Sequence, residues 1–392
     1  MTGVEQRFLD SESSERLAMK FPFGIEEEFF VVCEDTQVLE QQTHEAFLAR
    51  AKELSGGTVH RELLQSQVEA ATPVCSTFME AREHLRRSRR ALASAGGENG
   101  LAVISAGTHP TAQWNVQQKS PKQRYDAVMA ELQILGLRNL VCGMHVHVEV
   151  PDDDLRLDVM RRIIPFLPIL LALSTSSPFW QGMNTGFASY RMTSYDELPR
   201  TGLPPLFSDW LQYRGYIDVL REAGVIRDAS YIWWAIRPSH KYPTLELRLP
   251  DACTSLEDCI TVAALYRCLV CALMADRTIN SVINSPTRAL AKENKWRVQR
   301  FGLRAELIDP FRERPAIDAA SAARRLVEMV RRYAGALDCL PEVEHVETIL
   351  RRGTSADRQL AIYDEALASG CDHATALQQV KAWLQEETLV GC

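Results

Sequence analysis

The sequence contains no glycine-rich phosphate-binding loop, because neither a GxxxxGK[ST] nor a GxGxxG pattern occurs among its 392 residues. Such loops cradle phosphates with successive backbone N–H groups. Their absence excludes the P-loop and dinucleotide-binding classes. A nucleotide could then be held only by metal ions and arginines.

The sequence also has no excess of positive charge. Its 44 Lys and Arg residues and 51 Asp and Glu residues give a net charge of −7, with the two signs interspersed. The densest basic cluster, residues 86–90, is short and predicts a solvated helix face. We therefore expect no nucleic-acid partner.

Long apolar runs are missing as well. The most apolar stretch, residues 163–173, is interrupted by Pro165 and Pro168, so we expect no membrane partner. Residues 1–20 are polar and acidic and have no signal-peptide core. Ten cysteines are distributed along the chain, mostly within apolar segments. This pattern favours a cytoplasmic protein with reduced thiols.

The periodicity of apolar residues predicts an α+β fold. Strands are expected near residues 22–33, 59–71, 101–106, 139–150, 230–237 and 243–249. Helices are expected at residues 76–95, 121–135, 155–174 and 255–277, and throughout residues 286–392. Because strands do not alternate regularly with helices, a parallel barrel or doubly wound sheet is disfavoured. We expect an arm at residues 1–20 and one domain at 21–392, built on a curved, mostly antiparallel sheet backed by helices.

Four of the predicted strand segments place polar, chemically active side chains on one face. The segments are GIEEEFF (24–30), QVEAATP (67–73), GMHVHVE (143–149) and LELRL (245–249). Alternation puts Glu26 and Glu28 on one face, and likewise His145 with His147. Carboxylates in half-buried strands need compensation, and divalent cations are the simplest source of it. The pattern predicts a metal-dependent enzyme with its site on a sheet.

The glutamate between the two ligand candidates requires a separate explanation. Glu27 lies on the opposite face of its strand, with Ile25 and Phe29. These bulky neighbours argue against a solvated edge strand. We expect Glu27 to pair with an Arg or Lys behind the sheet.

The two histidines leave two classes of site open. One His beside hard oxygen ligands suits Mn²⁺ or Mg²⁺, whereas two His with carboxylates would suggest Zn²⁺ or Fe²⁺ and a metallohydrolase. Barrel hydrolases carry this HxH motif near the N-terminus, but here it lies in mid-chain. His109 either lines the cleft or sits in a buried turn.

Arginines supply the second half of the predicted site. Arg248 shares a strand face with Glu246, and its planar fork could bind a phosphoryl or carboxylate group. Arg237 and Arg191 are further candidates, but for each of them the sequence fits a structural role equally well.

At this point the motifs resemble a known family. GIEEEFF, QVEAATPV, GMHVHVEV and TLELRLPD stand in the order and spacing of the carboxylate–amine ligases related to glutamate–cysteine ligase, second type. The segment GMNTGFASYR also resembles a loop of that family, and the resemblance runs from about residue 20 to 380. The GMHVH and LELR segments are similar to glutamine synthetase. The resemblance implies a glutamine-synthetase-like cleft, formed by a curved antiparallel sheet with helices outside.

The resemblance also implies a role for each matching residue. The implied metal ligands are Glu26, Glu28, Glu69, His145 and Glu246. Glu62 would be a further ligand only if a bulge turned it to the same face. The implied nucleotide, substrate or phosphate contacts are His147, Arg237 and Arg248.

The implied reaction uses ATP and two or three Mg²⁺ or Mn²⁺ ions. A carboxylate, glutamate's γ-carboxylate in the named reaction, is phosphorylated and then attacked by an amine such as cysteine. Residues 176–206 are expected to form a lid, with Arg191 reaching the substrate carboxylate. A guanidino kinase on the same fold is an alternative; a nucleotide-binding regulator would be expected to have lost some metal carboxylates. The expected partners are small molecules and, in a homodimer, a second copy of the chain.

Overall fold

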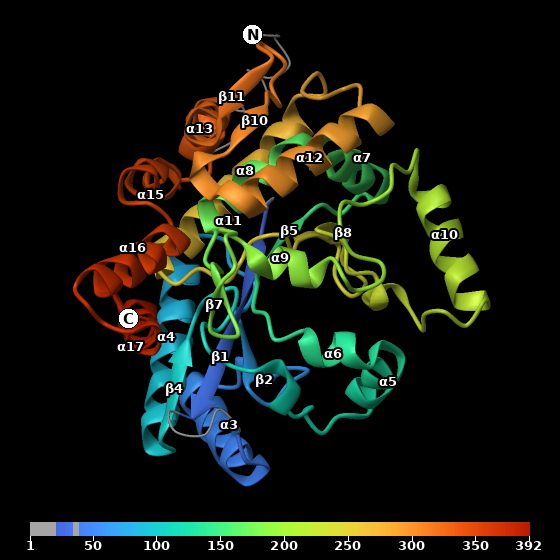
Figure 1. The fold of residues 1–392 in the computed structure, drawn as a ribbon. Helices are drawn as coiled ribbons and strands as arrows, with labels where there is room; N and C mark the ends of the chain where they lie inside the picture. The colour runs from blue at the N-terminus through green and yellow to red at the C-terminus, as the bar shows by residue number, and fades with distance from the viewer. Residues whose placement is uncertain (1–20, 34–38) are drawn as a thin grey trace.

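A computed structural model describes residues 21–33 and 39–392, so the predicted arm at residues 1–20 lies outside the described part. Its main sheet is seven-stranded and runs in the order β2-β3-β1-β5-β9-β8, with β4 also paired to β1 (Figure 1). The strand pairs of this sheet are antiparallel. The strands are β1 (Phe23–Cys33), β2 (Val59–Arg61), β3 (Gln67–Ala71), β4 (Leu101–Ile104), β5 (Met144–Glu149), β8 (Ile236–Pro238) and β9 (Thr244–Leu247). The predicted α+β fold with an antiparallel sheet is confirmed.

Strand β1 organises this sheet because both of its edges are paired. β3 runs along one edge, and β5 and β4 follow each other along the other. Its apolar residues alternate with acidic ones in the first half, so Ile25 and Phe29 are buried while Glu26 and Glu28 face the other side. One face of β1 therefore belongs to the core and the other to a polar surface.

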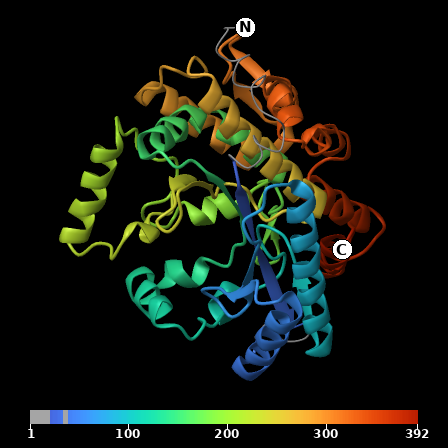
Figure 2. The same ribbon diagram turned by 180° about the vertical axis from the view of Figure 1, so that it is seen from behind.

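The first group of helices in the described chain lies between residues 41 and 222. They are α3 (Gln41–Ser55), α4 (Phe78–Glu98), α5 (Gln123–Leu132), α6 (Ile134–Arg138), α7 (Asp153–Ile163), α8 (Leu167–Ser174), α9 (Tyr190–Tyr195) and α10 (Trp210–Glu222). Helix α4 begins at Thr77, whose hydroxyl accepts from the Glu80 N–H while the Glu80 carboxylate accepts from the Thr77 N–H. Seen from behind, α4 runs alongside β1 (Figure 2).

The C-terminal half adds a second group of helices. They are α11 (Leu256–Ala275), α12 (Ser285–Phe301), α13 (Ala319–Ala336), α14 (Leu340–Glu344), α15 (Val346–Arg352), α16 (Ser355–Ala368) and α17 (His373–Leu389). Short 3-10 turns complete the described chain: η1 (Trp114–Val116), η2 (Ile164–Phe166), η3 (Ala229–Tyr231) and η4 (Gly302–Arg304). One continuous apolar core joins the sheet to these helices.

Helix α11 forms the centre of that core. By length and composition it could cross a membrane, contrary to the expectation that no apolar run is long enough, but 89% of its most apolar window is buried in the protein. It packs against α4, α7, α8 and α13. Its apolar character on all sides is that of a core helix.

Three local predictions are corrected by the structure. Residues 59–71 form the β2–β3 hairpin and not one strand. The region after residue 286 is not wholly helical, because β10 (Glu306–Ile308) pairs with β11 (Ala316–Asp318). Within the basic cluster at residues 86–90, Arg89 is fully buried and not solvated.

Candidate active site

Strand register brings the predicted site residues together in rows across the sheet. Glu26 of β1 lies opposite His145 of β5, and His147 lies opposite Glu246 of β9. Glu28 lies opposite Glu69 of β3. Directly opposed residues point to the same face of a sheet. The five predicted metal ligands therefore line one side, and all of them border a cleft of about 810 Å³.

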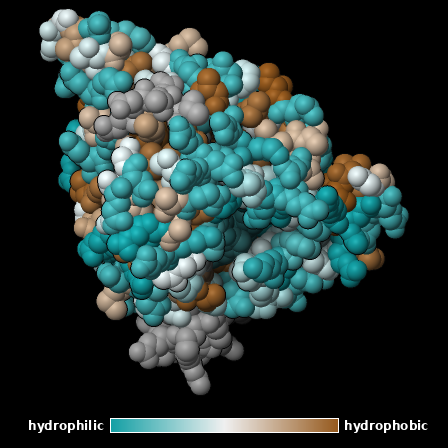
Figure 3. Space-filling model, turned by 90° about the horizontal axis from the view of Figure 1, so that it is seen from below, coloured by the Kyte–Doolittle hydropathy of each residue, from teal (hydrophilic) through white to brown (hydrophobic). Residues whose placement is uncertain are grey.

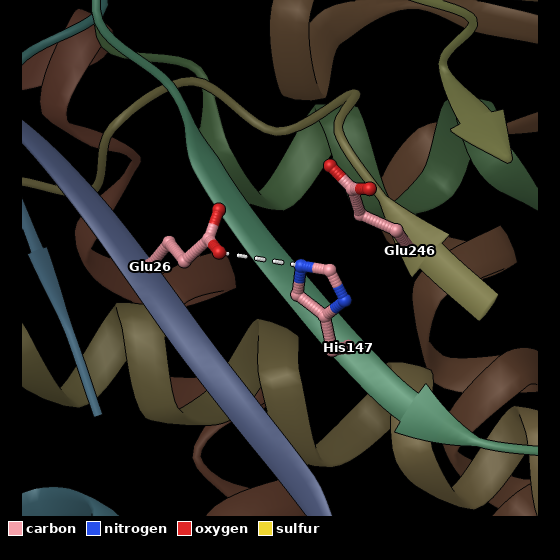
Figure 4. A group of neighbouring side chains, drawn as sticks. All are labelled: Glu26, His147 and Glu246. Carbon is pink, nitrogen blue, oxygen red and sulfur yellow. Dashed lines mark ion pairs between the residues drawn. The ribbon is translucent and has the colours of Figure 1, made fainter. Parts of the chain in front are cut away.

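The ligand atoms form three overlapping groups, in each of which they all lie within 4.8 Å of one another. The groups are Glu26, His147 and Glu246; Glu26, Glu69 and His145; and Glu28, Glu62 and Glu69. Figure 4 shows the first group on three neighbouring strands, with the Glu26 carboxylate directed at the His147 ring. Because the groups share residues, the cleft holds one connected cluster of donors.

His145 and His147 both contact Glu26. The Nδ1 of His145 is 3.1 Å from the Glu26 carboxylate, and the Nε2 of His147 is 3.4 Å from its other oxygen. Thr244 fixes the His147 ring through Nδ1 at 2.9 Å. His147, predicted as a nucleotide or substrate contact, thus lies among the candidate ligands as well.

The structure places Glu62 on a different face of the sheet from the one that its spacing predicts. It was expected on the opposite face because seven residues separate it from Glu69. The chain reverses between β2 and β3, so register decides the face and not the parity of the separation. His60 lies opposite Glu69, and Glu62 follows His60 by two residues. Polar and apolar residues stop alternating at residues 62–66, and this loss is the sequence signal that the chain reverses there.

The acidic end of the cleft concentrates negative charge. Burial, together with the neighbouring Glu28 charge, raises the pKa of Glu62 to about 7. Burial and the charges of Glu26, Glu62 and Glu28 raise the pKa of Glu69 well above its ordinary value. No Lys or Arg within residues 21–33 and 39–392 forms an ion pair with Glu28, Glu62 or Glu69. This end of the cluster has no cationic partner from the protein.

The other end is dominated by arginines. Arg237 binds the Glu246 carboxylate through two bonds of 2.8 and 3.0 Å, and Arg248 binds the same carboxylate. Burial alone would raise the pKa of Glu246, but the Arg237 and Arg248 charges hold it well below its ordinary value. Arg248 also approaches His145 Nδ1 at 3.5 Å and the Tyr195 hydroxyl at 3.4 Å. Two guanidinium groups thus stand beside the donor cluster.

Seen from below, the molecule has a hollow within a largely hydrophilic face (Figure 3). Lys52, His60, Lys122 and Lys241 contribute basic groups to the lining of the cleft, and Tyr125 and Trp233 contribute rings. His109 is not part of this lining. It is buried in a turn, where its Nδ1 accepts from the backbone N–H of Ala112 at 2.9 Å. The buried-turn alternative for His109 therefore holds.

Behind the sheet, Glu27 has the basic partner that was predicted. The Arg89 guanidinium of α4 binds its carboxylate at 2.5 and 3.2 Å, and neither side chain is more than 1% exposed. Arg89 also donates to the carbonyls of Cys253, Thr254 and Thr388. This buried pair links β1 to helices distant in sequence.

The segment predicted to form a lid, with Arg191 within it, borders the cleft and is packed against the rest of the protein. Residues 176–206 contain a hairpin, β6 (Phe179–Trp180) with β7 (Met183–Asn184), and helix α9. The backbone N–H groups of Ala188 and Ser189 bind the carbonyl of Gln299, so the segment is packed on α12. Arg191 borders the cleft but is 1% exposed, and both of its Nη atoms donate to backbone carbonyls. Its Nε is buried without a hydrogen-bond partner.

The donor set fits divalent cations of the hard type. The cluster is mostly carboxylate oxygen with imidazole in the minority, which is what Mg²⁺ and Mn²⁺ accept. The carboxylates Glu28, Glu62 and Glu69, which have no Lys or Arg ion pair in the described part of the chain, also supply the negative charge that such cations would balance. Cation binding would lower the raised pKa of Glu62 and Glu69.

Comparisons with known proteins agree with these features. Residues 22–376 match the family model described as glutamate–cysteine ligase family 2. The chain is 44% identical over 374 residues to "Putative glutamate--cysteine ligase 2" of Bradyrhizobium diazoefficiens, covering 95% of this chain and 85% of the relative. A protein of the same name from Rhodospirillum rubrum is 43% identical, with 94% and 96% covered.

A solved structure has a similar fold. Glutamate–cysteine ligase from Francisella tularensis, in complex with AMP, superposes with a TM-score of 0.69 at 13% identity, covering 94% of this chain and 89% of that one. The family match spans nearly the whole described chain and includes every strand of the cleft. The chain therefore belongs to glutamate–cysteine ligase family 2, a family of ligases.

Proposed function

We propose that the chain is an ATP-dependent carboxylate–amine ligase that joins the γ-carboxylate of glutamate to the amino group of cysteine. The names of its relatives and the AMP bound to the Francisella tularensis enzyme support the substrates. The observation that carries the proposal is the pairing, in one cleft, of a carboxylate-rich donor cluster with two arginines. A phosphoryl transfer to a carboxylate requires both.

In this proposal, Glu26, Glu28, Glu62, Glu69, His145 and Glu246 hold the divalent cations, with His147 beside them. When bound, Mg²⁺ or Mn²⁺ ions would neutralise phosphate charge. Glu246 has a second task, because it binds Arg237 and Arg248 and so fixes the direction of both guanidinium groups.

Arg248 is the proposed contact to the phosphoryl group in transfer. It lines the cleft and contacts both His145 and the Tyr195 hydroxyl. Its delocalised charge can stabilise the equatorial oxygens as the carboxylate is phosphorylated. Arg237 lies one strand further out, and we propose that it binds the other phosphates of ATP.

The two rival enzyme classes are less well supported. The HxH hydrolases considered above need a parallel barrel, whereas this HxH lies on an open antiparallel sheet. A guanidino kinase would use the same fold, but the relatives at 43–44% identity carry the name of a ligase. A regulator without activity is disfavoured by the retention of every predicted carboxylate ligand in the cleft.

The test is ADP formation by the purified protein with glutamate, an amine and either Mg²⁺ or Mn²⁺. We expect ADP release that requires both the acid and the amine, and a γ-glutamyl product detected by mass spectrometry. The control variant is Glu69→Gln, which keeps the shape of the side chain and removes its charge. ADP release that needs neither amino acid, or that needs a guanidino compound, would contradict the proposal.

The proposal includes a cytoplasmic location, small-molecule partners without nucleic acid or membrane, and a homodimer. The nine cysteines from Cys75 to Cys392 are free thiols, which suits a reducing compartment. Light scattering on the purified chain tests the homodimer, and a monomeric mass at micromolar concentration would remove it.

A further inference from the structure

We infer that Arg191 is a positioning residue, which orients Arg248 and Glu28 from the wall of the cleft and does not contact a substrate. The inference rests on the proposed function, because it assigns Arg248 to phosphoryl transfer and Glu28 to cation binding. Arg191 acts on the site through its contacts with the backbone.

The Arg191 guanidinium binds the backbone immediately after the end of β9. Its Nη2 donates to the carbonyl of Arg248 at 3.2 Å, and its Nη1 donates to the carbonyl of Leu249 at 3.1 Å. Its two Nη groups therefore bind the carbonyls of two adjacent peptide groups. These two bonds fix the backbone that carries the Arg248 side chain.

The same guanidinium also lies against the start of β5. A Cβ atom at Gly143 would be only 2.0 Å from Arg191 Nη2, so no side chain fits between them. The Gly143 N–H donates to the Glu28 carboxylate at 2.5 Å, and the Gly143 carbonyl accepts from the Glu28 N–H at 3.1 Å. Arg191 thus packs on the peptide that sets the direction of Glu28.

A buried carboxylate holds Arg191 in this place. Asp251 is fully buried and lies 3.9 Å from Arg191 Nη1. It accepts hydrogen bonds from the Ser177 hydroxyl at 2.7 Å and the Ser189 hydroxyl at 2.8 Å. Ser177 Oγ in turn accepts from the Arg191 N–H at 3.0 Å. Since Asp251 also forms a β-bridge with Gly143, one network ties the segment after β9 to the residue that precedes β5.

Two variants disturb this arrangement in different ways. Arg191→Lys keeps the positive charge but cannot hold two carbonyls at once. Gly143→Ala keeps Arg191 and displaces its guanidinium by steric contact. For both, we expect kcat to fall about tenfold to a hundredfold, as for other groups that orient metal ligands. KM for glutamate, for the amine and for ATP should stay within about threefold, because no substrate contact is lost.

A second measurement does not depend on turnover. Mn²⁺ binding to the free protein, followed by electron paramagnetic resonance, should weaken about tenfold in both variants if Glu28 is misdirected. Excess Mn²⁺ should restore part of kcat. A loss of stability alone would change the folded fraction but not the Mn²⁺ affinity of the folded protein.

Arg162→Lys is the matched control. Arg162 is also buried at 1% exposure and also donates to backbone carbonyls, those of Leu273, Asp276 and Ile279, but it does not line the cleft. It should lower Tm without changing Mn²⁺ affinity. If Arg191→Lys raised KM for an amino acid more than tenfold at unchanged kcat, Arg191 would be a substrate contact and the inference would be wrong. If Mn²⁺ affinity and kcat both stayed at wild-type values, it would also be wrong. A wild-type protein that forms no ADP would contradict the proposed function only, because the Mn²⁺ comparison still tests the positioning of Glu28.

Discussion

Glutamate side chains on the two faces of β1 have opposite electrostatic environments. On the core face, Glu27 is fully buried and the protein supplies its countercharge, Arg89, at hydrogen-bond distance. On the cleft face, Glu28 lies near Glu62 and Glu69, and in the described part of the chain none of the three forms an ion pair with a Lys or Arg; the basic group nearest to Glu28 is the His145 ring, at 3.8 Å. A structural carboxylate is neutralised by the fold, whereas a functional one is left for a ligand to neutralise. Of these two adjacent residues of one strand, Glu27 thus serves stability, and Glu28 is available for function.

The largest expected effect comes from breaking the core-face pair. Arg89→Met would leave the Glu27 carboxylate buried without its countercharge, at a cost of about 3–5 kcal/mol in the free energy of unfolding. Urea denaturation measures this loss. The double variant Arg89→Met with Glu27→Leu should recover only part of it, because three backbone carbonyls would still lack the Arg89 donor. An Arg89→Met protein as stable as wild type would refute the contrast between the faces.

The next largest effect is on the cleft side of the sheet. Arg248→Lys should lower kcat about a hundredfold with little change in the fold, because a point charge cannot replace the guanidinium fork. Steady-state kinetics and circular dichroism measure the two parts. Arg200→Lys, an arginine that does not line the cleft, is the control. Turnover near the wild-type rate would mean that Arg248 has a structural task.

A smaller effect, of opposite sign for stability, is expected at Glu69. Glu69→Gln removes one of several like charges, so the metal-free protein should gain stability, with a rise in Tm of about 2 °C or more. The same variant should lose Mn²⁺ binding and activity. Differential scanning calorimetry with and without Mn²⁺ distinguishes the two effects. A fall in the Tm of the metal-free variant would show that Glu69 is paired in the native state.

A further expected effect is the dependence of stability on pH. The pKa of Glu62 is raised to about 7 in the folded protein, above the ordinary value of 4.5, and that of Glu69 is raised as well. Between these values the folded state binds more protons than the unfolded state. The free energy of unfolding of the metal-free protein should therefore fall as pH rises from about 5 to 7. Saturating Mn²⁺ should abolish this slope, and an unchanged slope would indicate that the cations bind elsewhere.

Most of the sheet and its chemistry could be predicted from the sequence, because alternation fixes which side chains share a face. Glu26 and Glu28 on one side, and Glu27 with a basic partner on the other, follow directly from that period. Glu62 could not be placed, because its face depends on where the chain reverses and not on spacing. Arg191 was assigned to a lid because its segment looked like a loop. Its actual environment is made by Asp251 and Gly143, which lie far away in sequence.

The central claim is that the unpaired carboxylates of the cleft form the cation site of the enzyme. Titration of the metal-free protein with Mn²⁺, followed by electron paramagnetic resonance, tests it most directly. We predict more than one bound ion per chain, in keeping with three overlapping donor groups, and a clear loss of bound ions in Glu69→Gln but not in Arg162→Lys. Equal Mn²⁺ binding by wild type and Glu69→Gln, or no binding by wild type, would contradict the account.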